Sequence, residues 1–253
     1  MSAPLALKTH GLSKRFGDFL AVDAVNLEVV SGDIHALIGP NGAGKSTFFN
    51  LLTKFHLPSA GQIVFEGQDI TALVPAAIAR LGVVRSFQIS AIFPAMTALE
   101  NVRVALQSRA GIVFQFWRSK AVLSQFTERA RELLAEVGLL PQAEQLASSL
   151  PYGQRRALEL ATTLAMEPRL LLLDEPTQGM GAEDVARTAD LIRRVAKNRT
   201  VLMVEHNMGV VSRIADRISV LQRGRLIASG SYDEVSRQPA VLEAYLGHRG
   251  QRV

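Results

Sequence analysis

The sequence contains no cysteine among its 253 residues, and it has one tryptophan and three tyrosines. Without cysteine there is no disulfide framework, no thiolate zinc site and no thiol chemistry, so redox functions are disfavoured and a reducing compartment is permitted. No apolar run approaches the ~20 residues that a membrane-spanning helix needs. Residues 1–16 also lack the continuous apolar stretch of a signal peptide. We therefore expect a chain that does not span a bilayer by itself.

The charge balance shows no strong excess of either sign. The 28 lysines and arginines exceed the 23 aspartates and glutamates by a formal net charge of +5, and 48% of the residues are hydrophobic. This length and apolar content are sufficient for a large packed core, which excludes disorder as the dominant state. The basic residues are dispersed and lack the interleaved aromatic side chains of a single-strand binding groove. We expect a solvated, mildly basic surface and no nucleic acid as partner.

Short runs rich in leucine and β-branched residues predict strands. At 170–173 and 201–204 every residue is apolar, which is the pattern of strands covered by helices on both faces. The sequence therefore predicts an α/β fold with a mostly parallel sheet and flanking helices. The predicted strands are residues 25–30, 34–38, 63–66, 83–87, 170–173, 201–204 and 218–221.

Two helix starts are marked by capping boxes. Thr97 followed by Glu100 predicts a helix over 98–107, and Ser231 followed by Glu234 predicts a second one near the C-terminus. In each pair the hydroxyl and the carboxylate satisfy backbone donors of the first helical turn.

A long middle segment, about 97–166, has helix-forming composition and no convincing strand. It includes a predicted helix over 120–137 that Gly138 ends. We therefore expect one domain for the whole chain, with an α/β core of 1–96 and 167–253 and an inserted helical subdomain between them.

A phosphate-binding loop is predicted directly after the strand at 34–38. There the sequence matches G-x-x-x-x-G-K-[ST], and helix-compatible residues 48–52 follow. The glycines let backbone N–H groups converge on an anion at a helix N-terminus. Lys45 is placed to reach the β- and γ-phosphates, and the Ser46 hydroxyl to ligate Mg²⁺. The predicted ATP-binding residues of this loop are Gly39, Pro40, Asn41, Gly42, Ala43, Gly44, Lys45, Ser46 and Thr47.

Two adjacent carboxylates, Asp174 and Glu175, end the apolar run at 170–173. Ligands of open α/β sheets bind at the carboxyl ends of the strands, so both side chains are expected beside the phosphate-binding loop. Asp174 is then suited to hold Mg²⁺, and Glu175 to polarise the water that attacks the γ-phosphorus. Together these motifs predict an enzyme that binds ATP with Mg²⁺ and hydrolyses it.

With these motifs the chain resembles the ATP-binding subunits of ABC transporters over nearly its whole length. The resemblance implies a P-loop ABC ATPase core with an N-terminal antiparallel β part and the inserted helical subdomain. It assigns Phe16 to stacking on adenine, with a place in the core as the alternative. It also implies that Gln88 ligates Mg²⁺ and that His206 contacts the γ-phosphate, and it groups both with Lys45 and Glu175 as catalytic residues.

The family's signature sequence, commonly Leu-Ser-Gly-Gly-Gln, corresponds here to Pro151, Tyr152, Gly153 and Gln154 at the start of a helix. In the family this helix end acts across a dimer, on ATP held by the other subunit. Two departures stand out: Pro151 replaces the serine, which removes a hydroxyl and a backbone donor, and Tyr152 replaces the first glycine. Gly181 also stands where the family often has an aspartate.

A finer resemblance is to the LivG-type subunit of branched-chain amino acid importers. It rests on residues 1–52, 82–88, 152–156 and 244–247. It implies an ATPase that powers uptake of branched-chain amino acids or of related amino acids, amides or small organic solutes.

The same resemblance implies the partners and the location. A homodimer, or a heterodimer with a similar ATP-binding subunit, is expected to contact integral membrane permease subunits and, through them, a solute-binding protein. The chain is then expected at the cytoplasmic face of the inner membrane, as a peripheral protein. Gln88 and the surface of 89–96 are expected to pass motion to a permease. Phe114, Phe116 and Trp117 fit either that docking surface or the core of the helical subdomain.

Two other functional classes are alternatives to a transporter subunit. A soluble ABC ATPase acting on nucleic acid or ribosomes remains the alternative, although such proteins usually carry two cassettes or a long coiled coil, and this chain has one cassette and no sustained heptads. A regulatory GTPase is disfavoured, because the sequence has no Asn-Lys-x-Asp motif for guanine.

Overall fold

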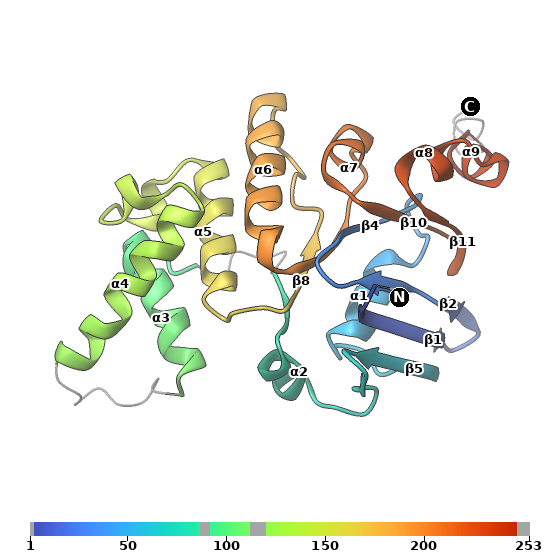
Figure 1. Cartoon of the computed structure of the whole chain (residues 1–253), viewed down its shortest axis with the longest axis horizontal. Helices are drawn as coiled ribbons and strands as arrows, with labels where there is room; N and C mark the ends of the chain where they lie inside the picture. The colour runs from blue at the N-terminus through green and yellow to red at the C-terminus, as the bar shows by residue number, and fades with distance from the viewer. Residues whose placement is uncertain (1–2, 87–91, 112–119, 247–253) are drawn as a thin grey trace.

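The computed structural model describes residues 3–86, 92–111 and 120–246. A β-rich part and a group of helices lie side by side along the longest axis (Figure 1). The strands are β1 (Leu5–Phe16), β2 (Phe19–Val25), β3 (Glu28–Val30), β4 (Ile34–Ile38), β5 (Ala60–Phe65), β6 (Gln68–Asp69), β7 (Val83–Arg85), β8 (Leu170–Asp174), β9 (Thr200–Val204), β10 (Arg217–Gln222) and β11 (Arg225–Gly230). The helices are α1 (Lys45–Leu52), α2 (Pro75–Leu81), α3 (Ala98–Arg109), α4 (Lys120–Glu136), α5 (Tyr152–Leu164), α6 (Ala182–Val195), α7 (Met208–Ile214), α8 (Tyr232–Ser236) and α9 (Pro239–Leu246), with short 3₁₀ turns at Leu140–Gln142, Ala147–Ser149 and Ala196–Asn198.

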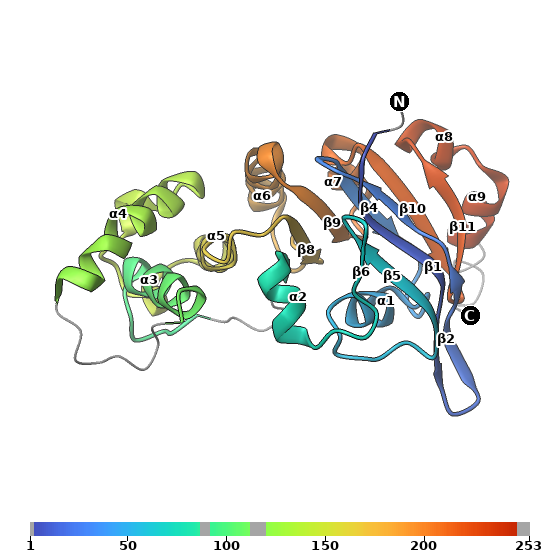
Figure 2. The same cartoon turned by 60° about the horizontal axis from the view of Figure 1, so that its bottom comes forward.

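The main sheet has the strand order β11-β10-β4-β9-β8-β7. β10 and β11 pair antiparallel, and every other neighbouring pair in this sheet is parallel. A second, antiparallel sheet has the order β2-β1-β5-β6, with β3 also pairing with β1, and lies against the first sheet (Figure 2). The expected α/β class, with a mostly parallel sheet and an N-terminal antiparallel part, is confirmed.

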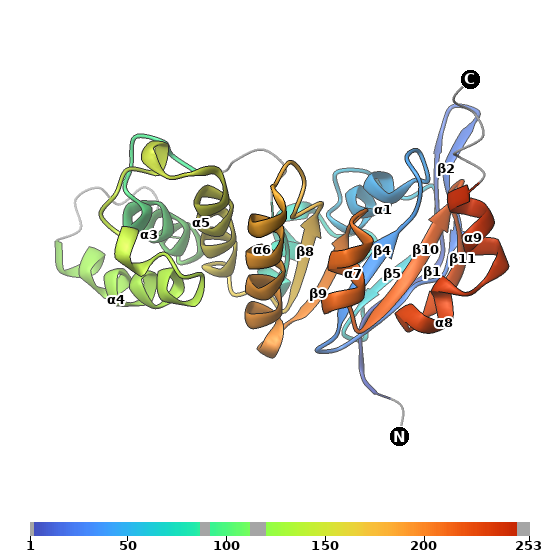
Figure 3. The ribbon, with the colours of Figure 1, turned by 90° about the horizontal axis from the view of Figure 1, so that it is seen from above.

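The strands β4, β8 and β9 in the middle of the main sheet are buried along their whole length, as their largely apolar sequences predict. In β8, Leu171 and Leu173 join one core cluster, and Leu170 and Leu172 join the other. The first cluster includes residues of α6 and α7, and the second includes residues of α1 and of the antiparallel sheet. α6 and α7 lie in front of the sheet and α1 behind it in Figure 3. Such a sheet fixes the positions of its strand ends, because helices hold it from both sides.

The helical group consists of α3, α4 and α5, which pack on one another. The predicted capping box of α3 is confirmed, since Thr97 Oγ1 accepts from the Glu100 N–H at 3.1 Å and the Glu100 carboxylate accepts from the Thr97 N–H at 2.8 Å. The box at Ser231 and Glu234 is present in α8. Within 97–111 and 120–166 no strand is found beyond one isolated bridge. In the described part of the chain, no helix is both long and apolar enough to cross a membrane.

The strand predicted over 25–30 is wrong in its middle. β2 ends at Val25 and β3 starts at Glu28. Between them, Asn26 Oδ1 accepts from the Gly11 N–H at 2.8 Å, and the Leu27 N–H donates to the Thr9 hydroxyl at 2.9 Å. These side-chain hydrogen bonds replace the ladder and break the strand. β1 and β11 lie outside the predicted strands altogether.

Candidate functional site

The carboxyl ends of four parallel strands meet at one edge of the main sheet. Leu37 of β4 pairs with Val204 of β9, and Val204 pairs with Asp174 of β8. Arg85 of β7 pairs with Leu172, two residues before Asp174. The phosphate-binding loop, the two predicted carboxylates and His206 therefore leave the sheet side by side, as expected for a ligand crevice.

The predicted phosphate-binding residues are brought together as a loop and the first turn of a helix. Gly39 to Gly44 form the loop, and Lys45, Ser46 and Thr47 begin α1. Gly39 has φ of 151° and Gly44, the N-cap of α1, has φ of 101°. A Cβ at Gly39 would lie 2.1 Å from the Leu221 carbonyl oxygen, and one at Gly44 would lie 2.4 Å from that of Ala21. Both positions therefore require glycine.

Lys45 folds back over this loop. Its Nζ donates to the carbonyl oxygens of Gly39 at 2.7 Å and Pro40 at 3.0 Å, and the residue is 8% exposed. Burial lowers the pKa of Lys45, while the carboxylates of Glu175 and Asp174 act in the opposite direction. The ammonium group is thus held at the loop where an anion would sit, by acceptors that a phosphate can replace.

Asp174 is a buried carboxylate with a cationic partner that the sequence did not reveal. Its Oδ2 forms an ion pair with Arg85 Nη2, and Arg85 Nη1 donates to Asn50 Oδ1 of α1 at 2.7 Å. The guanidinium also lies 5.8 Å from the centroid of the Phe49 ring. Arg85 therefore links β7, β8 and α1 at the site, and a planar guanidinium suits such bridging better than an ammonium group.

The oxygen donors at this edge fit a hard cation such as Mg²⁺. Asp174 uses Oδ2 for Arg85, and within the described residues nothing hydrogen-bonds its Oδ1 or the Ser46 hydroxyl. The predicted third ligand, Gln88, lies outside the described residues. The described ranges contain no group of three histidine, cysteine, aspartate or glutamate side chains that would form a separate metal site.

Glu175 and His206, which follow β8 and β9, lie close together. The Glu175 Oε2 lies 4.0 Å from His206 Nδ1. Glu175 has a left-handed φ of 46°, and its N–H donates to the Val204 carbonyl at 2.9 Å. A positive φ is strained for a side chain other than glycine, and such strain concentrates at functional sites. The turn directs the chain out of the sheet immediately after Asp174.

Glu205 is a second residue that sequence reasoning missed. It follows β9 and is 0% exposed. Its two carboxylate oxygens accept hydrogen bonds from Thr177, which lies beyond Glu175, and from the backbone N–H groups of His206 and Asn207. The available signal was its place directly after the apolar run at 201–204 and next to His206. A charged residue that is buried at the end of such a run needs hydrogen-bonding partners.

Phe16, at the end of β1, is 42% exposed, which excludes the alternative of a core side chain. Its ring packs edge-on against His56 with centroids 5.2 Å apart, and Lys14 Nζ lies 5.0 Å from its centroid. An exposed aromatic face of this kind is available for stacking on a planar ligand. Phe114, Phe116 and Trp117 lie outside the described residues.

The signature positions open α5. Pro151 is the N-cap residue and provides no side-chain cap, while Tyr152 starts the helix and is 42% exposed. Gly153 approaches α6 closely, since a Cβ there would lie 3.3 Å from Asp184 Oδ1. Pro151, Tyr152, Gly153 and Gln154 line a cavity of about 530 Å³ together with residues of α6 and of the turn at 137–139. Among the described residues that line it, none belongs to the phosphate-binding loop.

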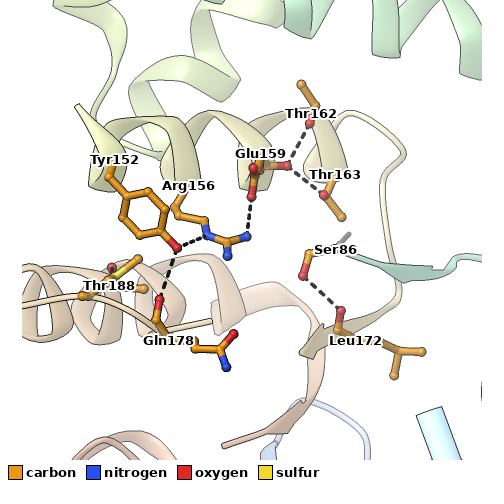
Figure 4. Close-up of polar contacts among 10 residues, drawn as sticks. Ser86, Tyr152, Arg156, Glu159, Thr162, Thr163, Leu172, Gln178 and Thr188 are labelled. Atoms are coloured by element: carbon orange, nitrogen blue, oxygen red, sulfur yellow. Dashed lines mark hydrogen bonds and ion pairs between the residues drawn. The ribbon is translucent and has the colours of Figure 1, made fainter. Parts of the chain in front are cut away.

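Tyr152 links the helical group to the segment that follows Glu175 (Figure 4). Its hydroxyl donates to the Gln178 carbonyl at 3.2 Å and accepts from Arg156 Nε at 3.2 Å. Arg156 Nη1 also donates to Glu159 Oε2 at 2.8 Å. Although burial opposes it, the hydrogen bonds of Glu159 and Tyr152 raise the pKa of Arg156. The tyrosine thus makes a polar contact within the chain that a glycine at this position lacks.

Two family models match this sequence. One described as "ABC transporter" matches residues 22–178, and one described as "Branched-chain amino acid ATP-binding cassette transporter" matches residues 225–250. The chain is 41% identical over 254 residues to the high-affinity branched-chain amino acid transport ATP-binding protein LivG of Escherichia coli strain K12, with 98% of this chain and 99% of the relative covered. The corresponding protein BraF of Pseudomonas aeruginosa is 41% identical over 257 residues, with the same coverage.

Solved structures of ATP-binding cassettes share the fold. A cassette of an ABC transporter in its ADP conformation is 29% identical, with a TM-score of 0.83 over 96% of this chain and 99% of that one. A nucleotide-free cassette is 28% identical, with a TM-score of 0.82 over 95% and 98%. The architecture described above is therefore that of a single nucleotide-binding cassette.

Proposed function

This chain belongs to the family of ABC transporter ATP-binding proteins, and from that premise we propose that it hydrolyses ATP to power an importer of branched-chain amino acids or related small solutes. One observation carries the proposal: the ends of β4, β8 and β9 bring the phosphate-binding loop, Asp174, Glu175 and His206 to one edge of the sheet. The solute class is supported by the identity of 41% to LivG and BraF.

Nucleotide binding is assigned to the loop at 39–47 and to Phe16. The backbone N–H groups at the start of α1 and the Lys45 ammonium group receive the phosphates, while the exposed Phe16 ring stacks on adenine. Ser46, Asp174 and Gln88 would hold Mg²⁺, which supplies positive charge against the phosphate oxygens.

Hydrolysis is assigned to Glu175 and His206. Glu175 accepts a hydrogen bond from the attacking water and orients it in line with the γ-phosphorus. His206, whose Nδ1 lies 4.0 Å from Glu175 Oε2, contacts the γ-phosphate and helps to position the water. Lys45 and Gln88 add charge and coordination at the transferred group.

The signature helix is assigned to the ATP bound by a second subunit. Gly153, Gln154 and the N-terminus of α5 would contact that nucleotide, because Pro151 lacks the usual hydroxyl and backbone donor. The assembly is a homodimer or a heterodimer with a similar subunit, docked on integral membrane permeases at the cytoplasmic face of the inner membrane. A solute-binding protein acts through those permeases.

The substitution Glu175→Gln tests the proposal. We expect it to retain ATP binding and to lower kcat by about a hundredfold or more, since it removes the base and keeps the shape. ATP should then hold two subunits together, which size-exclusion chromatography with light scattering detects. Glu183→Gln, in an exposed pair with Arg187 on α6, is the matched control and should behave as the unmodified protein. Steady turnover by Glu175→Gln would assign the base to another residue.

A further inference from the structure

The Glu205 carboxylate is buried, yet all of its hydrogen-bonding capacity is used. Its Oε1 accepts from the Thr177 N–H at 3.2 Å and from the Thr177 hydroxyl. Its Oε2 accepts from the N–H groups of His206 at 2.8 Å and Asn207 at 2.9 Å. A carboxylate offers about four acceptor sites, so these donors satisfy it without water. A buried charge is tolerated only with such partners.

The two oxygens serve two different segments. Oε1 holds the segment after β8 through Thr177, which lies two residues beyond Glu175. Oε2 holds the backbone of His206, which begins the segment after β9. The Glu175 N–H adds a third connection by donating to the Val204 carbonyl at 2.9 Å. One rigid carboxylate therefore spans the two segments that carry Glu175 and His206.

We propose that Glu205 is a positioning residue for hydrolysis, which fixes the spacing between Glu175 and His206. The inference rests on the proposed ATPase function. Both side chains must address one water and one phosphate group, and a displacement of about 1 Å lowers such rates by about a hundredfold. Without this carboxylate, the backbone hydrogen bond from the Glu175 N–H to the Val204 carbonyl is the remaining connection described above. The turn at Glu175 also has a strained left-handed φ of 46°, which persists only where the surrounding structure holds it.

A purely structural role predicts a different result. If Glu205 merely stabilised the fold, weakening its contacts would lower the unfolding temperature and leave the turnover of folded protein unchanged. If Glu205 positions the two side chains, kcat falls while the affinity for ATP stays, since the phosphate-binding loop is untouched.

The experiment uses the full chain and alters the donor rather than the buried charge. Thr177→Val removes the hydroxyl at nearly constant volume, and Thr177→Ser keeps it. We expect Thr177→Val to lower kcat about tenfold and to change the Kd for ATP by less than about twofold. Thr177→Ser should recover most of the rate. In Glu205→Gln an NH₂ group would face other donors, and we expect a loss of kcat of about a hundredfold.

Thr163→Val is the matched control. The buried Thr163 hydroxyl donates to the Glu159 carbonyl at 2.8 Å within α5, so its loss removes a buried threonine hydrogen bond away from Glu175 and His206. Thermal unfolding, Kd for ATP and kcat are measured for every variant. We expect Thr163→Val to lower the unfolding temperature less than Thr177→Val, because its acceptor is uncharged, and to keep the unmodified kcat.

The outcomes separate the two proposals. If the unmodified chain binds ATP and never hydrolyses it, the proposed function fails. If it hydrolyses ATP and Thr177→Val keeps full kcat, the positioning role of Glu205 is overturned while the ATPase stands. Equal losses of kcat in Thr177→Val and Thr163→Val would overturn it as well, because the effect would then follow stability. A loss in Thr177→Val that Thr177→Ser restores supports it.

Discussion

The two parts of this chain that are proposed to contact nucleotide, the phosphate-binding loop and the signature end at residues 151–154, differ in how many of their polar groups have partners within the chain. At the phosphate-binding loop, Lys45 is buried on the carbonyls of Gly39 and Pro40, and Arg85 neutralises Asp174. At the signature end, Tyr152 is exposed beside an open cavity of about 530 Å³. At the first end, contacts within the chain itself hold the Lys45 ammonium group and the Asp174 carboxylate in place. The second presents a helix N-terminus whose N-cap residue, Pro151, makes no side-chain cap.

The difference follows from the elements that carry each end, which are the main sheet for the loop and α5 for the signature residues. The loop follows β4, which with β8 and β9 is buried along its whole length, so packing holds the start of the loop in place. The signature end starts α5, a helix of the α3–α5 group. Residues further along α5, such as Leu158 and Ala161, share a core cluster with α6 and β8. At its exposed start, the Tyr152 hydroxyl bonds the Gln178 carbonyl of the segment after Glu175. Changes at the first end should therefore abolish binding, and changes at the second should adjust turnover.

Lys45→Ala tests directly whether the first end binds the phosphates. It removes the cation that the loop holds for the phosphates, and we expect the affinity for ATP to fall by about a thousandfold, equal to about 4 kcal/mol. Isothermal titration calorimetry measures the loss. Lys8→Ala, in an exposed ion pair with Glu28, is the control and should bind ATP normally. Unchanged affinity in Lys45→Ala would mean that the loop does not bind the phosphates.

Arg85→Ala tests how far the chain itself holds the Asp174 carboxylate in place at the first end. It leaves the buried Asp174 carboxylate without its partner, which we expect to lower the free energy of unfolding by about 3 kcal/mol. Mg²⁺ with ADP should recover more stability than in the unmodified protein, because the cation supplies the missing positive charge.

Urea unfolding with Mg²⁺ and ADP, and again with a chelator, measures both effects of Arg85→Ala. The matched control is Arg169→Ala, whose partner Glu66 is partly exposed, so the expected loss is at most about 1 kcal/mol. Equal losses in the two variants would show that Arg85 contributes no more than a surface charge.

Tyr152→Phe tests the second end and should have the smallest effect. It removes one hydroxyl that bonds Gln178 and Arg156, so we expect a stability change of about 1 kcal/mol and unchanged affinity for ATP. The ATPase rate should change by less than about threefold. A rate assay with Tyr232→Phe as control measures it. A loss above tenfold would show that this link is essential to turnover, and that the second end is less independent than the comparison states.

Much of the fold was predictable because its signals are local. Short runs of mainly apolar residues predicted β4, β8 and β9 within a residue, and the capping box at Thr97 and Glu100 marked the start of α3. β1 was missed because four charged or histidine residues and Gly11, with φ of 56°, interrupt its apolar pattern. Its pairing with β2, β3 and β5 holds it as a strand despite that pattern.

The site was predictable wherever a motif lies in one stretch of sequence. The loop at 39–47 and the pair Asp174 and Glu175 are of this kind. Arg85 and Glu205 were missed, because their roles depend on Asp174 and Thr177, which lie 89 and 28 residues away. Long-range ion pairs and hydrogen bonds leave no periodic mark in a sequence, and they become visible only once the strands are in register.

The close approach of Leu221 to Gly39 determines when, during synthesis, the phosphate-binding loop can reach its final structure. The first residues of the phosphate loop emerge early, but the carbonyl that packs against Gly39 belongs to β10, near the end of the sequence. β4 itself lies between β9 and β10, so both of its neighbours in the sheet are translated long after it. A nascent chain thus carries the phosphate-binding loop without the strands that pack beside it until β9 and β10 have been synthesised, so we expect it to bind a nucleotide only after that point.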